Sequence, residues 1–257
     1  MRSRWFHKPL LHQEHSIEKK VTWLELFYDL IFVAAFIQLG NSLSSSLSFT
    51  SFLGFSAIFT TLWLVWSGFT FYTNRFIVAD VLHRVIVFLK MLSVGSMAVM
   101  AEGVFNHHPT GFALSYSFAQ FMIALLHFRS YKQADDGKPF SAYWGSVFAL
   151  GGLIWFVSCF VPEPLNYIFW SVGVGVVFMA PFNKLSLSIF DRFPNDKVHL
   201  AERYGLLTLI VLGESFVKVL GSLTSGDIGV GALLQTSITL LITISIWWIY
   251  FDDVAGS

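Results

Sequence analysis

The sequence predicts an all-α membrane protein, a polytopic bundle of about eight transmembrane helices with both termini in the cytoplasm. Only 12% of the 257 residues are charged and 55% are hydrophobic, whereas a soluble domain carries about 25% charged residues. The mean hydropathy is +0.64. Apolar residues also gather in stretches of about 20, the length that crosses about 30 Å of hydrocarbon. The composition therefore argues against a soluble enzyme.

The apolar stretches divide the chain into a tail at residues 1–20, a bundle at residues 21–251 and an end at residues 252–257. The predicted spans cover residues 21–40, 52–72, 82–102, 111–129, 143–161, 165–183, 204–222 and 229–250. Pro181 predicts a kink near the end of the sixth span. The tail has no signal-peptide pattern, so we expect it to stay uncleaved, either frayed or as a helix on the membrane surface.

Basic residues set the predicted orientation, because Lys and Arg accumulate in cytoplasmic loops. Of the 16 basic residues, 14 lie in the tail or near every second connection between spans. The connections in between contain none, so the alternation places both termini in the cytoplasm. Seven aromatic residues near these inner ends are interpreted as interfacial anchors: Trp23, Tyr72, Tyr131, Trp144, Tyr204, Trp248 and Tyr250.

Ionisable residues inside the predicted spans are the strongest functional signal. Each charge near the middle of a membrane costs about 2.5–3.5 kcal/mol, so these groups must pair, be neutralised or face water. Five residues fall in this class: Glu25, Asp29, Lys90, Glu214 and Lys218.

The first and third spans are predicted to share a polar cluster. Glu25 and Asp29 are four residues apart, which places them on one face of the first helix. Asp29 and Lys90 lie at similar depths, so we expect them to pair, while His83 shares a face with Lys90 and Arg84 reaches Glu25 from the flank. Two interpretations stay open: a protonatable or cation-binding site that opens to the cytoplasm, or a static clasp between the two helices.

Other polar positions give weaker signals. Glu214 precedes Lys218 by four residues, the favourable order for an intrahelical ion pair. Glu214 also lies near the predicted membrane centre, where it is interpreted either as part of that pair or as a group facing water or an ion. Gln38, Asn41 and His127 are interpreted as interhelical hydrogen-bonding or interfacial groups.

Motifs for catalysis, cofactors, metals and nucleic acids are missing from the sequence. There is no HExxH, phosphate-binding loop or GxSxG pattern. Cys159 is the one cysteine, which excludes an internal disulfide and every multi-cysteine metal site. The 16 basic and 16 acidic residues balance and are divided among the membrane flanks, so nucleic acid is not an expected partner. We therefore expect no enzyme activity, no catalytic residues, no cofactor and no metal.

Five blocks in order resemble the bacterial low temperature requirement protein A family, LtrA. They are "VTWLELFYDLIFVAAFIQL" (residues 21–39), "GFTFYTNRF" (68–76), "DVLHR" (80–84), "AERYGLLTLIVLGES" (201–215) and "WWIYFDD" (247–253). The positions that match the family motifs are Glu25, Asp29, Asn74, Arg75, Asp80, His83, Arg84, Glu202, Arg203, Gly213 and Glu214. They include most of the ionisable residues that the cost of burial singles out.

The resemblance implies a multi-pass protein of the bacterial plasma (inner) membrane, named for a requirement for growth in the cold. It implies no catalytic residue. Family members usually continue with further helices after the last block, so the resemblance implies either a natural short form or part of a longer chain.

Two functions are compatible with these observations. The first is transport or binding of a small solute or ion, with Glu25, Asp29, His83, Lys90 and Glu214 in a polar interior to which Arg84 contributes. The alternative is a non-transporting scaffold or regulator whose buried ion pairs are structural. The expected partners are the lipid bilayer and a small solute or ion, and association between copies of the chain stays open.

Overall fold

The structure of the protein is a computed structural model that describes residues 9–11, 20–45, 47–78, 80–101, 104, 109–133, 137–224 and 229–255. These residues are mostly helical, which confirms the predicted all-α class. The long helices are α1 (Trp23–Ser45), α2 (Phe49–Arg75), α3 (Val81–Met100), α4 (Pro109–Gln133), α5 (Lys138–Ser158), α6 (Leu165–Met179), α8 (Lys197–Thr224) and α9 (Val230–Ala255). Eight helical segments in the described ranges are long and apolar enough to span a membrane. The cytoplasmic placement of the termini remains a prediction.

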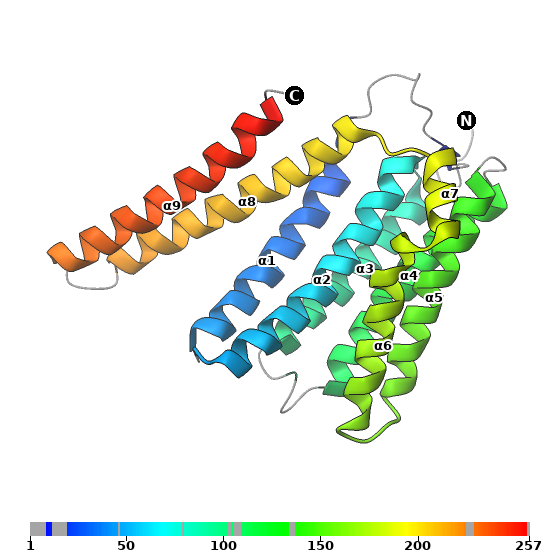
Figure 1. Cartoon of the computed structure of the whole chain (residues 1–257), viewed down its shortest axis with the longest axis horizontal. Coiled ribbons are helices and arrows are strands. Elements are labelled where there is room, and N and C mark those ends of the chain that lie inside the picture. The colour runs from blue at the N-terminus through cyan, green and yellow to red at the C-terminus, as the bar shows by residue number, and fades with distance from the viewer. Residues whose placement is uncertain are drawn as a thin grey trace. The chain divides into compact units, whose positions relative to one another are not determined.

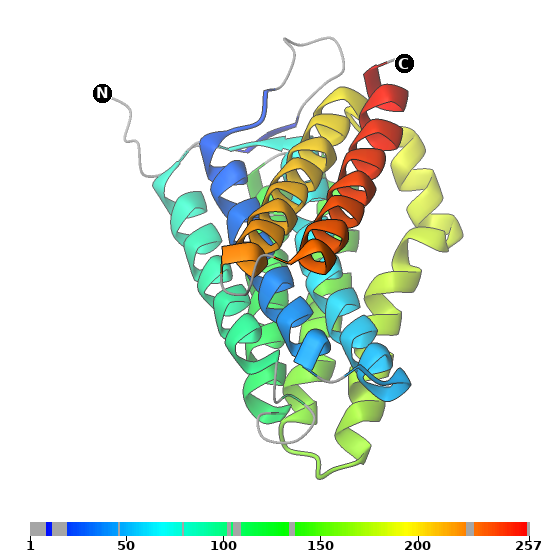
Figure 2. The same ribbon diagram turned by 90° about the vertical axis from the view of Figure 1, so that its left-hand side faces the viewer.

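The chain forms two compact units, Met1–Lys197 and Val198–Ser257, each described by itself. In the first unit α3 packs between α1 and α4, and α5 packs between α4 and α6, while α2 contacts α1, α4 and α6 (Figure 1). In the second unit α8 and α9 run side by side in opposite directions (Figure 2). A Cβ atom added at Gly205 of α8 would lie 3.4 Å from the Phe251 ring of α9, an ordinary van der Waals contact.

A short pair of strands closes one end of the first unit. After α2 the chain continues as β2 (Phe76–Ile77), which pairs in antiparallel fashion with β1 (Leu10–Leu11). Leu10–Leu11 is therefore a strand, whereas the sequence predicted a frayed tail or a surface helix. The extended backbone that leaves α2 offers a pairing edge that hydropathy does not reveal. Residues 1–8 and 12–19 of the tail lie outside the described residues.

One helix of the first unit is missing from the sequence prediction. α7 (Lys184–Arg192) begins at Asn183, whose side-chain oxygen accepts a hydrogen bond from the Ser186 backbone N–H at 2.9 Å. Its nine residues are too short to span a membrane, so a search for apolar stretches passes over it. Just before it, α6 ends at Met179 and Pro181 lies in the 3₁₀ turn η3 (Ala180–Phe182). The predicted kink is thus the end of the helix.

Candidate functional site

A pocket of about 540 Å³ lies in the first unit where α1 and α3 begin and α2 ends. We call it the carboxylate pocket. Its ionisable lining consists of Glu25, His83 and Arg84, and hydroxyl groups come from Thr22 and Thr73. Three residues singled out from the sequence therefore line one pocket, and they come from two different helices.

Glu25 combines its place in the pocket with a structural role at the start of α1. One oxygen, Oε2, accepts hydrogen bonds from the Thr22 backbone N–H at 2.8 Å and from the Thr22 hydroxyl at 2.9 Å. The Glu25 N–H donates back to Thr22 Oγ1 at 3.3 Å. This reciprocal pair is a capping box, which satisfies backbone groups in the first helical turn. The Thr-x-x-Glu spacing of residues 22–25 is the sequence signal for this cap.

Asp29 lies deeper, one helical turn beyond Glu25, and its residue exposure is 0%. The Trp66 indole N–H of α2 donates to its Oδ1 at 2.7 Å. This hydrogen bond ties α1 to α2 inside the bundle. Asp29 does not line the carboxylate pocket.

Lys90 of α3 is also fully buried and reaches the same level of α2. Its ammonium donates to the Val65 carbonyl at 3.0 Å, next in sequence to Trp66. It also lies 5.3 Å from the centre of the Tyr28 ring and 5.1 Å from that of Phe69, within the range of cation–π attraction. The predicted common depth of Asp29 and Lys90 is thus observed.

The expected direct ion pair between Asp29 and Lys90 is wrong for the described residues. Both side chains bond to adjacent residues of α2, and the Lys90 ammonium makes no carboxylate contact within ion-pair distance. The physical reason is that α2 supplies a carbonyl and an indole N–H at that depth. Counting residues along a helix predicts how deep a side chain lies, but it does not predict how the helices are rotated toward one another.

His83 and Arg84 occupy the first turn of α3. The His83 ring is buried against Phe69 and Tyr72, with ring centres 6.2 Å apart in both cases. Arg84 is exposed at the same pocket as Glu25. The described contacts include no ion pair between Arg84 and Glu25. The two side chains therefore line the same pocket without bonding to each other across it.

Asp80 of the family motif anchors the start of α3. Its Oδ1 accepts a hydrogen bond from the His83 backbone N–H at 3.2 Å as the N-cap of the helix. Both oxygens also accept from the Arg129 guanidinium of α4, at 3.1 Å and 2.5 Å. The pair is bidentate and buried, and it fixes the helix that carries His83 against α4.

Asn74 and Arg75 hold the connection after α7 to the end of α2. The Asn74 side chain donates to the Asp196 carbonyl at 2.9 Å and accepts from the Asp196 N–H at 3.1 Å. Arg75 Nε donates to the Phe193 carbonyl at 3.1 Å. These motif residues therefore position backbone, and neither lines the carboxylate pocket.

The remaining predicted positions lie on α8 in the second unit: Glu202, Arg203, Gly213 and Glu214. Glu214 is half-buried and Lys218 is exposed. The described contacts contain no ion pair between these two side chains, so the predicted intrahelical bridge is wrong. Spacing of four residues permits such a bridge but does not hold two flexible side chains in it.

Two of the predicted aromatic anchors are core residues instead. Tyr72 is fully buried, and its hydroxyl shares a 2.9 Å hydrogen bond with Ser130 of α4. Trp144 is 9% exposed and packs on Phe148 and Phe190. Aromatic residues near a helix end satisfy either an interface or a core, and hydropathy does not separate the two. Trp23, in contrast, is strongly exposed as an anchor should be.

Comparisons with known proteins agree with the architecture. The family described as bacterial low temperature requirement A protein (LtrA) matches residues 20–257. The uncharacterized protein RA0937 of Rhizobium meliloti (strain 1021) is 27% identical over 258 residues, covering 96% of this chain and 62% of the relative. The chain thus spans less than two thirds of the length of that relative. No solved structure matches the chain.

Proposed function

Because the chain belongs to the family of bacterial low temperature requirement A proteins, we propose that it binds and moves a small solute or ion across the bacterial inner membrane. One observation carries the proposal. Glu25, His83 and Arg84, from the ends of α1 and α3, line a single pocket of about 540 Å³. Ionisable groups on membrane helices are expensive, so their convergence on a pocket supports a binding role. We expect binding or transport, without catalysis.

The capping box suggests how occupancy of the pocket acts on the helix. Thr22 donates two hydrogen bonds to Glu25 Oε2, at 2.8 Å and 2.9 Å. Both bonds are strongest while the carboxylate is charged, because charge-assisted hydrogen bonds are about twice as strong as neutral ones. A proton or cation on Glu25 weakens them and loosens the first turn of α1. Ligand occupancy then biases the conformation of the helix end that borders the pocket.

Asp29 and Lys90 have a supporting role in this proposal. Both are buried outside the pocket lining and are hydrogen-bonded to neighbouring residues of α2. They hold α1 and α3 against α2 while Glu25 exchanges its ligand. The proposal therefore assigns ligand exchange to Glu25 and structural support to the deeper charges.

The burial of Asp29 and Lys90 favours the alternative function, a membrane scaffold that transports nothing. Complete burial of Asp29 and Lys90, each with a hydrogen-bond partner on α2, is what a scaffold requires. Under this alternative Glu25 serves only as a helix cap, and pocket occupancy changes nothing across the membrane.

Flux in liposomes separates the two functions. Proton and K⁺ flux is measured with the purified chain as wild type, Glu25→Gln, Glu214→Gln and Glu163→Gln, the last in the exposed turn between α5 and α6. We expect wild type and Glu163→Gln to exceed empty vesicles and Glu25→Gln to fall to the empty level. Glu214→Gln tests the predicted position on α8. Flux equal to empty vesicles in every sample would overturn the transport proposal and leave the scaffold.

A further inference from the structure

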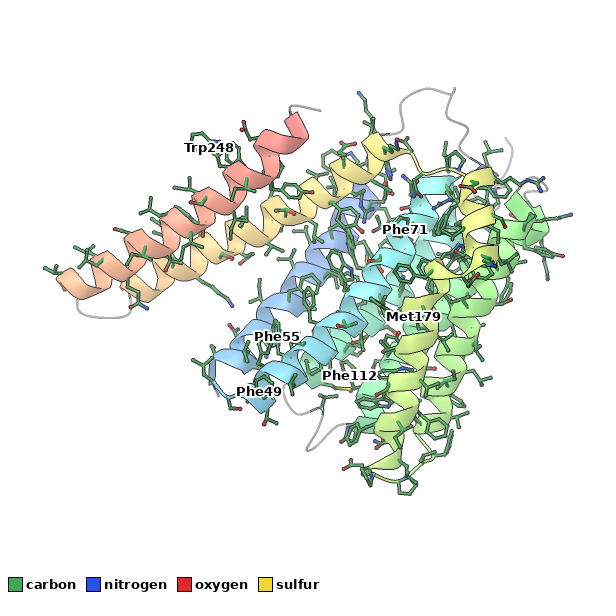
Figure 3. All side chains as sticks on the ribbon, in the orientation of Figure 1. Phe49, Phe55, Phe71, Phe112, Met179 and Trp248 are labelled. Atoms are coloured by element: carbon green, nitrogen blue, oxygen red, sulfur yellow. The ribbon has the colours of Figure 1, made fainter. Side chains whose placement is uncertain are left out.

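A second pocket, of about 120 Å³, lies on the other side of α2. We call it the arginine pocket. Its lining is mostly aromatic and comes from α2, α4, α5, α6, α7 and the 3₁₀ turn η3. Phe71, a lining residue, lies near one end of α2, whereas Phe49 marks the opposite end (Figure 3). None of the residues that line the carboxylate pocket contributes to it.

Four side chains of this lining carry a buried polar atom that has no hydrogen-bond partner among the residues that the structure describes. The atoms are Ser67 Oγ, Arg75 Nη2, His127 Nδ1 and Trp144 Nε1. The exposed fractions of the last three residues are 2%, 1% and 9%. An unsatisfied buried donor or acceptor costs about 1–3 kcal/mol. The four atoms belong to residues around one small pocket, so a group bound there would satisfy them once the side chains turn toward it.

The charge of Arg75 indicates which kind of group the pocket would bind. The Arg75 guanidinium is held by the Phe193 and Phe71 carbonyls and lies over the Phe140 and Phe190 rings, 4.4 Å and 5.1 Å from their centres. Within the described part of the chain no carboxylate lies within ion-pair distance of Arg75. Arg129, one helix away, is neutralised by Asp80. A buried cation that lacks an anion is strongly unfavourable, so the group that fits beside Arg75 is an anion.

We propose that the arginine pocket binds a small oxyanion, an inorganic one or the carboxylate of a small acid. The Arg75 Nη2–H, the Trp144 indole N–H and the Ser67 hydroxyl donate to its oxygens. His127 donates from Nδ1 in the tautomer that carries the proton there. The volume equals that of about four liquid waters, which suits an ion of about four or five non-hydrogen atoms.

The test is thermal unfolding of the full chain in detergent, at constant pH and ionic strength, with increasing sodium nitrate, acetate or phosphate. Sodium gluconate is the control anion, because it is too large for the pocket. We expect at least one small oxyanion to raise the Tm with saturation, which yields an apparent Kd. Nitrate or phosphate alone would identify an inorganic ligand, and acetate would identify a carboxylate.

Donor deletions locate the effect. Trp144→Phe keeps an aromatic ring and removes the N–H, whereas Ser67→Ala removes the hydroxyl. We expect the apparent Kd to rise about tenfold for Trp144→Phe. Trp155→Phe is the matched control, because the Trp155 indole N–H is also buried with no hydrogen-bond partner in the described ranges, whereas Trp155 lines a different pocket. Its apparent Kd should equal that of wild type, as should that of Glu25→Gln. No saturable rise above gluconate, or a rise that Trp144→Phe leaves unchanged, would overturn the proposal.

Discussion

The carboxylate pocket and the arginine pocket lie on opposite faces of one helix and differ in how their charges are satisfied. Phe69 and Thr73 of α2 face the first, which holds Glu25 in a capping box. Gly68, Phe71 and Arg75 of α2 face the second, where a cation has aromatic rings and carbonyls around it. Under the two proposals above, α2 separates a site for protons or cations from a site for anions. Each prediction below tests one side of this comparison.

The largest expected effect comes from the ion pair that fixes α3 to α4, helices that line the two pockets. Asp80→Asn removes the carboxylate that pairs with Arg129 and leaves a buried cation. We expect the free energy of unfolding to fall by about 3–5 kcal/mol, as measured by denaturation in detergent. Asp191→Asn, at an exposed position on α7, is the control and should change it by less than about 0.5 kcal/mol. Equal effects of the two variants would show that the pair does not support the pockets.

Trp66→Phe tests the support of Asp29 beside the carboxylate pocket. The substitution removes the indole N–H that lies 2.7 Å from the Asp29 carboxylate. A hydrogen bond to a charged group contributes about 1.5–3 kcal/mol, so we expect a loss of that size in the free energy of unfolding. Trp170→Phe removes a similar bond, 2.9 Å from the neutral Ser158 hydroxyl, and should cost about 0.5–1.5 kcal/mol. The reverse order would contradict a charged Asp29.

Gly68→Ala changes the lining of the arginine pocket and leaves the lining of the carboxylate pocket unchanged. A Cβ at Gly68 would lie 2.8 Å from Phe148 Cζ, so the ring must move into the pocket or α5 must shift. We expect a loss of about 1–3 kcal/mol in the free energy of unfolding together with loss of oxyanion stabilisation. Gly95→Ala is the control, because a Cβ added at Gly95 of α3 meets nothing within 4 Å. We expect it to raise the free energy of unfolding by about 0.5–1 kcal/mol. Oxyanion stabilisation that survives Gly68→Ala would place the ligand elsewhere.

The smallest effect concerns which side of the membrane the pockets face. Cys159 follows α5 at the end remote from Phe140 and Trp144, and burial raises the pKa of its thiol. The thiolate is the reactive form, so labelling is slow at neutral pH. While the pH is below the pKa of the thiol, each unit of increase in pH speeds labelling up about tenfold. We expect a membrane-impermeant maleimide to label intact cells from outside at alkaline pH. Labelling that requires membrane disruption would reverse the predicted orientation.

Length and hydropathy were enough to predict the bundle, because eight apolar stretches leave few alternatives in a membrane. α7 was missed because it is short, and β1 because strand pairing depends on backbone brought close by folding. The cost of burying charge identified Glu25, Asp29 and Lys90, but helix rotation decided that each of the last two side chains bonds to α2. Spacing along the chain carries no direct information on that rotation.

The arginine pocket escaped prediction for a different reason. Arg75 and Trp144 lie near helix ends, where the positive-inside rule and aromatic belts already account for such residues. His127 was interpreted as an ordinary hydrogen-bonding group. The signal that was available is the spacing of Gly68, Phe71 and Arg75 along one face of α2, which places a small residue and a cation together. Without the partner helices, nothing in the sequence marks that face as the wall of a pocket.

In the proposed function, Glu25 exchanges its proton or cation with the pocket while Asp29 stays sealed. This difference is measured by infrared difference spectra of the chain in lipid, recorded between about pH 4 and about pH 8, a range that brackets ordinary carboxyl titration. We expect a carboxyl band that disappears in Glu25→Gln and persists in Asp29→Asn. Identical difference spectra for wild type and Glu25→Gln would contradict it, because the pocket carboxylate would then not exchange.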